Sequence, residues 1–328
     1  MHYISTRGDS KKRTFSQAVL EGLADDGGLL VPESLPDLSN RWPEWADLDY
    51  PDLAFEVLRP LATDLSEETL RECCRSAYGA SYGGPVAPLK ALGGVHLLEL
   101  FHGPTLAFKD VALQLLGRLF GVILEQQDQE LNIVAATSGD TGSAAIHGLK
   151  DVPRVRLFVT HPDGRIAPLQ RRQMTTVVED SVFNIAVDGT FDDCQQMVKE
   201  LSRDLEFKKK HNIGAVNSIN FARIAAQIVY YFAAYLQTPG AARRVPAVVA
   251  VRVCSKNGSS PSLRDPRLQR ERHFTDLLQH RCLQTGRCTC DSFAGHGYSS
   301  SQQFRALPLS NSRRGRCSCK GPDGRIFL

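Results

Sequence analysis

A short apolar run, Leu131 to Ala136, passes directly into the polar turn Thr137-Ser-Gly-Asp-Thr-Gly142, which leads into an apolar segment ending at Leu149. A brief apolar run bounded by turn-forming residues is typical of a buried strand, and the segment after the turn has a helical pattern. A strand that feeds a helix through a tight turn is the repeating unit of α/β proteins. This unit limits the fold more than any other feature of the sequence.

The alternation of strand and helix patterns continues along the chain. Thr190 is expected to cap a helix whose first turn carries Asp192 and Asp193, where acidic groups favour the helix dipole. Further strands are predicted at Val155 to Thr160, Val182 to Val187 and Pro246 to Val251, and a buried helix from residue 218, with apolar residues at Phe221, Ala225, Ile228, Phe232 and Leu236. Earlier helices are predicted at Thr14 to Leu23, Leu53 to Leu61 and Ser66 to Ala77. The sequence therefore predicts an α/β fold with parallel sheets and helices on both faces.

The charge of the chain is unevenly distributed. The net charge of +3 combines about +9 in residues 250–328, which hold 14 Lys and Arg against 5 Asp and Glu, with −6 in residues 1–249. Six of the nine cysteines also lie in this basic tail. The 328 residues are enough for two domains, and the two parts need separate interpretations.

The sequence predicts a cytoplasmic protein. Its most apolar stretch, Phe221 to Leu236, is interrupted by Arg223 and Gln227, so no eighteen-residue apolar span is expected to cross a membrane. The N-terminus has no apolar segment behind its first charges, unlike a signal peptide.

Residues 252–328 show no sustained helix or strand period, and three interpretations are open. A basic tail could bind nucleic acid, but it lacks lysine runs and interleaved aromatic residues. A zinc site could use Cys288, Cys290, Cys317 and Cys319, although structural zinc sites favour wider cysteine pairs. The mixture of Arg, Ser, Cys and Pro favours the third interpretation, an out-of-frame or alternatively joined end.

Lys109 is the first candidate for chemistry. It follows Phe101-His-Gly-Pro-Thr-Leu-Ala-Phe108, a sterically constrained apolar turn. Apolar surroundings favour the neutral amine of a lysine, which is the form that attacks carbonyl carbons. The alternative is a lysine at a helix start that reaches solvent, with Asp110 as its solvent-exposed partner.

The turn Ser138 to Gly142 is the second candidate. Backbone N–H groups at a helix start, together with the hydroxyls of Ser138 and Thr141, can hold a carboxylate or phosphate. Asp140 would repel such an anion and suits a hydroxyl, an amine or a protonated ring atom. The alternative is an ordinary capped helix after a βα turn. The glycine spacing fits neither a Walker loop nor a Rossmann fingerprint.

Three motifs carry a resemblance to one enzyme family. His102-Gly-Pro-Thr-Leu-Ala-Phe-Lys-Asp110 resembles the cofactor-lysine motif of bacterial and fungal threonine synthases. Ala136 to Ala144 resembles their second signature, and Val216-Asn-Ser-Ile-Asn-Phe-Ala-Arg223 a third. The opening residues are also similar, so the resemblance covers about residues 1–250 in order. Dehydratases and cysteine synthases, which share the fold, have lysine motifs that resemble this one less.

The resemblance implies a pyridoxal 5'-phosphate enzyme of fold type II that converts O-phospho-L-homoserine and water to L-threonine and phosphate. Lys109 would bind the cofactor as a Schiff base and carry protons, and Asp140 would lie near its ring oxygen. Ser138 and Thr141 would hold the substrate carboxylate. Asn217, Asn220 and Arg223 are candidates for the substrate phosphate or for domain positioning. No metal, nucleic acid or membrane partner is expected.

The resemblance also divides the chain. Residues 1–129 would form the N-terminal region and the first part of a large cofactor domain, 130–240 a smaller substrate domain, and 241–251 a returning strand. Residues 252–328 would form the atypical tail. Family members follow the returning strand with a Gly-Asn-Phe-Gly loop for the cofactor phosphate, whereas this chain continues Arg252-Val-Cys-Ser-Lys-Asn-Gly258. The alternative function is therefore a truncated or frameshifted, catalytically impaired relative.

Overall fold

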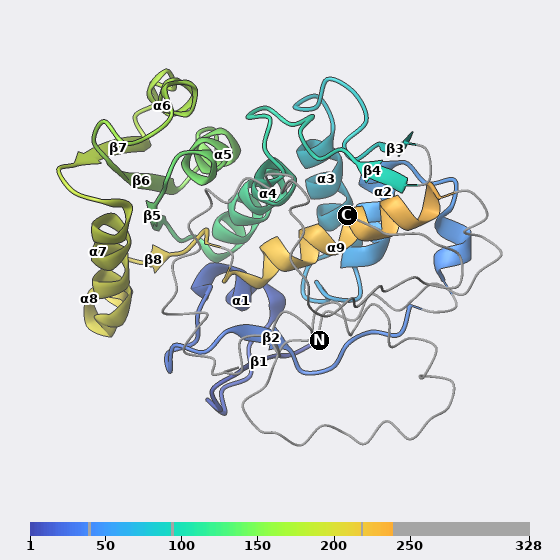
Figure 1. The fold of residues 1–328 in the computed structure, drawn as a ribbon. Coiled ribbons are helices and arrows are strands. Elements are labelled where there is room, and N and C mark those ends of the chain that lie inside the picture. The colour runs from blue at the N-terminus through green and yellow to red at the C-terminus, as the bar shows by residue number, and fades with distance from the viewer. Residues whose placement is uncertain (39–40, 93–94, 218, 239–328) are drawn as a thin grey trace, which may run out of the picture.

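Four parallel strands form the central sheet, in the order β7-β6-β5-β8 (Figure 1). The strands are β5 (Leu131–Ala136), β6 (Val155–Pro162), β7 (Val182–Val187) and β8 (Ile213–Gly214). In the register, Ile133 lies between Leu157 and Gly214. The predictions of β5, β6 and β7 are confirmed, whereas β8 has only two residues and shows no sequence pattern.

This computed structural model describes residues 1–38, 41–92, 95–217 and 219–238. The expected strand at Pro246 to Val251, the segment 241–251 and the tail 252–328 with its cysteine pairs lie outside the described residues.

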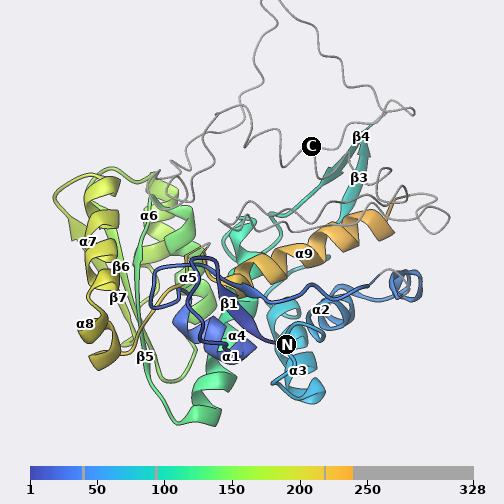
Figure 2. The same ribbon diagram turned by 90° about the horizontal axis from the view of Figure 1, so that it is seen from below.

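Helices cover both faces of the sheet, as Figure 2 shows. On one side lie α5 (Asp140–Leu149) and α6 (Pro168–Thr175), and on the other α7 (Phe191–Arg203) and α8 (Leu205–Lys210). The predicted cap of α7 is confirmed, because the Thr190 hydroxyl accepts the Asp193 N–H and the Asp193 carboxylate accepts the Thr190 N–H. The α/β fold with a parallel sheet and helices on both faces is thus confirmed.

A second layer is built of helices. Its members are α1 (Phe15–Glu21), α2 (Tyr50–Leu58), α3 (Glu67–Tyr78), α4 (Lys109–Gln127) and α9 (Phe221–Leu236). The predicted helices are confirmed with small shifts; α2 begins at Tyr50 because Asp49 caps it and Pro51 occupies its first turn. Helix α9 leaves the sheet and packs against α4 and α2. The domain boundaries at 129 and 240 remain predictions.

Short antiparallel pairs and one 3-10 helix complete the fold. β1 (Tyr3–Ser5) pairs with β2 (Leu30–Pro32), and β3 (Leu89–Leu92) pairs with β4 (Val95–Leu98). The 3-10 helix η1 spans Trp42–Trp45. None of the helices in the described ranges is long and apolar enough to cross a membrane.

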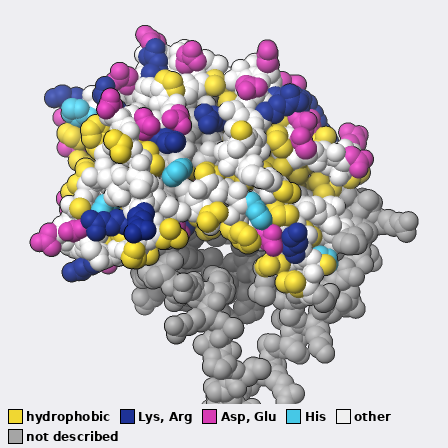
Figure 3. Space-filling view, turned by 90° about the horizontal axis from the view of Figure 1, so that it is seen from above, with side chains coloured by type: hydrophobic (Ala, Val, Ile, Leu, Met, Phe, Trp, Pro, Cys, Tyr) yellow, Lys and Arg dark blue, Asp and Glu magenta, His cyan; other side chains and the backbone are white. Residues whose placement is uncertain are grey.

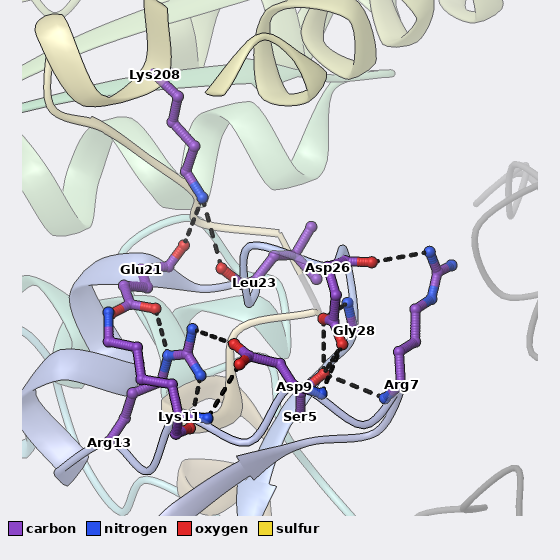
Figure 4. Close-up of polar contacts among 10 residues, drawn as sticks. All are labelled: Ser5, Arg7, Asp9, Lys11, Arg13, Glu21, Leu23, Asp26, Gly28 and Lys208. Atoms are coloured by element: carbon purple, nitrogen blue, oxygen red, sulfur yellow. Dashed lines mark hydrogen bonds and ion pairs between the residues drawn. The ribbon is translucent and has the colours of Figure 1, made fainter. Parts of the chain in front are cut away.

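Ion pairs fix the N-terminal segment (Figure 4). Arg13 is fully buried, and its guanidinium lies 2.6 Å from the Glu21 carboxylate and 2.8 Å from that of Asp9. Lys208 reaches across from α8 and donates to the carbonyl oxygens of Glu21 at 3.4 Å and Leu23 at 3.5 Å. Because Glu21 is the last residue of α1, the ammonium complements the helix dipole there, and the two bonds tie the segment to the sheet layer.

Candidate active site

Lys109 is the first residue of α4, and Asp110 shapes the turn that leads to it. The Asp110 carboxylate accepts hydrogen bonds from the N–H of Thr105 at 2.9 Å, its hydroxyl at 2.6 Å and the N–H of Ala107 at 3.4 Å. These bonds close the turn around Leu106, whose φ of 60° lies in the left-handed region. Burial raises the pKa of Asp110, although the hydrogen bonds oppose this. The interpretation of Asp110 as a solvent-exposed partner of Lys109 is wrong, because the side chain is fully buried and points back into the turn.

The amine of Lys109 forms an ion pair with the Asp140 carboxylate. The lysine side chain is 11% exposed and that of Asp140 29%, so the pair is largely shielded from water. The ammonium also lies 4.7 Å from the centre of the Phe108 ring, which contributes a cation–π contact. Two sequence motifs 31 residues apart therefore meet at one charged pair.

The turn before α5 presents Asp140 and is held by Thr137. The Thr137 hydroxyl accepts the N–H groups of Gly139 at 3.0 Å and Gly142 at 2.7 Å, and Asp140 accepts the Thr141 N–H at 3.1 Å. The expectation that the backbone N–H groups of this turn face an anion is wrong for Gly139, Thr141 and Gly142, because all three donate to side chains of the turn itself. Ser138 and Thr141 are half-buried at the same helix start.

A pocket of about 380 Å³ adjoins the pair. It is lined by Thr105, Leu106, Ala107, Phe108, Asp140, Leu169, Gln170 and Gln173. The exposed apolar side chains of Leu106, Phe108 and Leu169 are thus combined with one carboxylate and two amides. The pocket can therefore offer a small molecule both hydrogen-bonding groups and apolar contacts. A second pocket, about 330 Å³, is lined by residues between Arg41 and Leu70 and by neither motif.

The third motif lies at the start of α9. Asn220 is fully buried; its amide donates to the Val19 carbonyl at 2.8 Å and the Ala215 carbonyl at 3.2 Å, and its oxygen accepts the Ala222 N–H. Asn217 is half-buried, and its carbonyl accepts the Asn220 N–H at 3.0 Å. The Asn220 side chain thus caps α9 and joins it to α1.

Arg223 is buried in the first turn of α9. Its guanidinium donates to the Val216 carbonyl at 2.8 Å, and burial lowers its pKa to about 10. Within the described part of the chain, its Nε has no hydrogen-bond partner. The hydrogen bonds and ion pairs of the described residues do not join Asn217, Asn220 or Arg223 to Lys109 or Asp140.

Sequence reasoning missed four residues that build the site. Thr105 and Thr137 organise the two turns, and Gln170 and Gln173 line the pocket from α6. Pro168, at the first position of α6 shortly after a strand, is a helix-start signal that could have placed the two glutamines.

The described residues include no group of three or more His, Cys, Asp and Glu side chains arranged to hold a metal ion. Cys73, Cys74 and Cys194 are buried free thiols. On the face seen in Figure 3, acidic and basic side chains are intermingled with hydrophobic ones.

Comparison with known proteins identifies the family. Residues 2–78 match the family described as "Threonine synthase N terminus". Threonine synthase from Schizosaccharomyces pombe is 49% identical over 246 residues, which cover 71% of this chain and 48% of that protein. Threonine synthase from Pseudomonas aeruginosa is 50% identical over 240 residues, which cover 72% and 51%. The chain belongs to the threonine synthase family.

The fold agrees with a solved member of the threonine synthase family. The X-ray structure of PLP-bound threonine synthase from Brucella melitensis superposes with a TM-score of 0.68 and 42% identity, covering 73% of this chain and 53% of that one. The chain spans about half the length of the curated threonine synthases that it matches.

Proposed function

We propose that this chain is a cytoplasmic threonine synthase that binds pyridoxal 5'-phosphate at Lys109 and converts O-phospho-L-homoserine and water to L-threonine and phosphate. The observation that carries the proposal is the Lys109–Asp140 pair beside the 380 Å³ pocket, in a member of the threonine synthase family. A shielded primary amine next to a pocket fits a cofactor that carries an aldehyde.

Each residue has a role in this proposal. When bound, the cofactor supplies an electron sink for a carbanion. Lys109 attaches it and then moves protons at its Nζ, while Asp140 holds that amine in place. Ser138 and Thr141 bind the substrate carboxylate through their hydroxyls.

The third motif, Val216 to Arg223, is assigned to the substrate phosphate and to positioning. Arg223 and Asn217 orient the substrate phosphate or the segment that binds it, and the Arg223 Nε, which has no partner among the described residues, supports such a role. The Asn220 amide is already bonded to chain carbonyls, so we assign it to positioning.

The test separates cofactor binding from turnover. The full-length chain is incubated with pyridoxal 5'-phosphate, reduced with borohydride and mapped by peptide mass spectrometry. We expect the adduct at Lys109, its loss in Lys109→Ala, and its retention in Lys150→Ala, which removes a lysine at the end of α5. Adducts spread over surface lysines, with none at Lys109, would overturn the proposal.

A second candidate is a catalytically impaired relative. The observation that favours it is the sequence after residue 251, which departs from the family's Gly-Asn-Phe-Gly pattern. Phosphate release from O-phospho-L-homoserine decides between the two. A chain that forms the Lys109 adduct but releases no phosphate is the impaired form.

A further inference from the structure

Thr105 lies at the junction of three parts of the site. It is 5% exposed, and each of its polar groups is bonded. Its N–H and hydroxyl donate to the two oxygens of Asp110 at 2.9 and 2.6 Å, and its carbonyl accepts from Nε2 of Gln173 at 3.1 Å. One buried residue of the lysine turn is therefore held by α4 on one side and by α6 on the other.

Helix α6 is in turn bonded to the turn that presents Asp140. The Ser143 hydroxyl donates to the carbonyl of Gln170 at 3.3 Å and to that of Gly139 at 3.1 Å. The Gln170 side chain also fills the space beside Gly139, where an added β-carbon would lie 2.0 Å from its amide oxygen. Contacts thus run without a break from the lysine turn, through α6, to the Asp140 turn.

We propose that Asp110 and Gln173 are positioning residues that, through Thr105, hold the turn carrying Lys109 against the turn carrying Asp140. This rests on the proposed function, in which Lys109 is the reactive residue. Both side chains act on Thr105 and the turn backbone. Their effect on the reaction is therefore geometric, and a misplacement of about 1 Å can reduce a rate as much as 10²-fold.

The experiment compares variants of the full-length chain. Gln173→Leu removes the bond to the Thr105 carbonyl at similar side-chain size, and Asp110→Asn replaces the carboxylate that accepts the N–H groups. Asp193→Asn is the matched control for Asp110, because Asp193 accepts the N–H and hydroxyl of Thr190 in the same way at α7. Arg172→Leu is the control for Gln173, since it lies exposed on α6.

Two reagents are used on each variant, with peptide mass spectrometry at Lys109 and at Lys150 as internal reference. Pyridoxal 5'-phosphate with borohydride reports the rate of adduct formation. Acetic anhydride needs no cofactor site and reports how well the Lys109 amine is held and shielded. Circular dichroism records the folded fraction.

We expect Gln173→Leu and Asp110→Asn to slow the cofactor adduct at Lys109 about fivefold and to speed its acetylation by a similar factor, the size of one lost hydrogen bond. The double variant should equal the stronger single one, because both act through Thr105. Thr105→Ser, which keeps all three polar groups, should behave like the wild type, as should both controls.

Wild-type labelling of Lys109 in folded Gln173→Leu would overturn the inference, and so would changes that are equal at Lys109 and Lys150. A wild-type chain without the Lys109 adduct would instead refute the proposed function. The acetylation comparison would then still decide whether Asp110 and Gln173 hold the turn.

Discussion

Gly117 of α4 and Gly148 of α5 lie in direct backbone contact. A β-carbon added at Gly117 would fall 2.0 Å from the Gly148 carbonyl oxygen, and one added at Gly148 would fall 2.5 Å from the Leu113 carbonyl oxygen. Because α4 begins at Lys109 and α5 at Asp140, this contact sets the spacing of the two helices whose first residues form the charged pair.

Gly117→Ala should therefore destabilise the protein. The added methyl group must push the two helices apart, and such overpacking costs about 1–3 kcal/mol. Gly121→Ala, one turn further along α4, meets only a Val152 methyl at 3.6 Å. Since alanine favours a helix by about 0.5–1 kcal/mol over glycine, this control should be neutral or stabilising in urea denaturation. Equal effects of the two changes would contradict the close-contact explanation.

Asn220→Ala should lower stability by about 2 kcal/mol, because it removes a helix cap and leaves the Val19 and Ala215 carbonyls without their donor. Urea denaturation of Thr190→Ala, which removes only the α7 cap, gives the comparison and should show about half that loss. A fully stable Asn220→Ala chain that fails only in substrate binding would return Asn220 to the substrate site.

Asp26 should make the fold sensitive to acid. Burial alone would raise its pKa, but hydrogen bonds from the Ser5 hydroxyl and from the N–H groups of Gly28 and Asp9 outweigh burial and lower the pKa from the ordinary value of an aspartate (Figure 4). The unfolded chain then binds the proton at a higher pH than the folded chain does. The stability that Asp26 contributes is fully present at pH values above its pKa in the unfolded chain. It is lost as the pH falls through its pKa in the folded chain.

Melting temperatures measured between pH 7 and pH 2.5 would show this effect. Asp26→Asn should melt lower at neutral pH and lose less stability than the wild type over the acid range. Glu179→Gln, which changes an exposed carboxyl, serves as the control. Parallel curves for Asp26→Asn and the wild type would contradict this assignment.

Asp140→Asn should increase the rate at which acetic anhydride acetylates the Lys109 amine about tenfold. The reason is that a shielded hydrogen bond to a charged group contributes about 1.5–3 kcal/mol. The matched pair is Lys150 with Asp151, where the charges are 3.9 Å apart and Asp151 is 63% exposed. Asp151→Asn should leave Lys150 reactivity unchanged, because exposed pairs contribute little. The idea fails if both asparagine changes have the same effect.

The sheet was largely predictable from sequence because β5, β6 and β7 are compact apolar runs between turn residues. Helix α4 was not predictable in this way, because its own apolar residues occupy all of its faces and form no single stripe. Even Asp110 and Gln114 are buried on it. Strand β8 forms because Ile213 pairs with Asn132, a partner that local pattern does not reveal.

The candidate site was predictable as far as its two motifs. Lys109 and Asp140 lie in separate motifs, and the packing of α4 against α5 brings them into contact. The direction of Asp110 depends on Thr105, and the burial of Asn220 depends on Val19, 201 residues away. The sequence does not distinguish a polar residue that donates to a buried carbonyl from one that binds a ligand.

The return of α9 to α2 and α4 has a consequence for synthesis of the chain. The strands of the sheet are synthesised before α9, so the surfaces of α2 and α4 that pack against α9 are still exposed at that stage. They can be buried only after synthesis has reached Leu236, the last residue of α9. Contacts closed over such a long loop form late, so the sheet with its helices is the part that can fold first. Until α9 docks, the nascent chain exposes apolar surface of the kind that chaperones recognise.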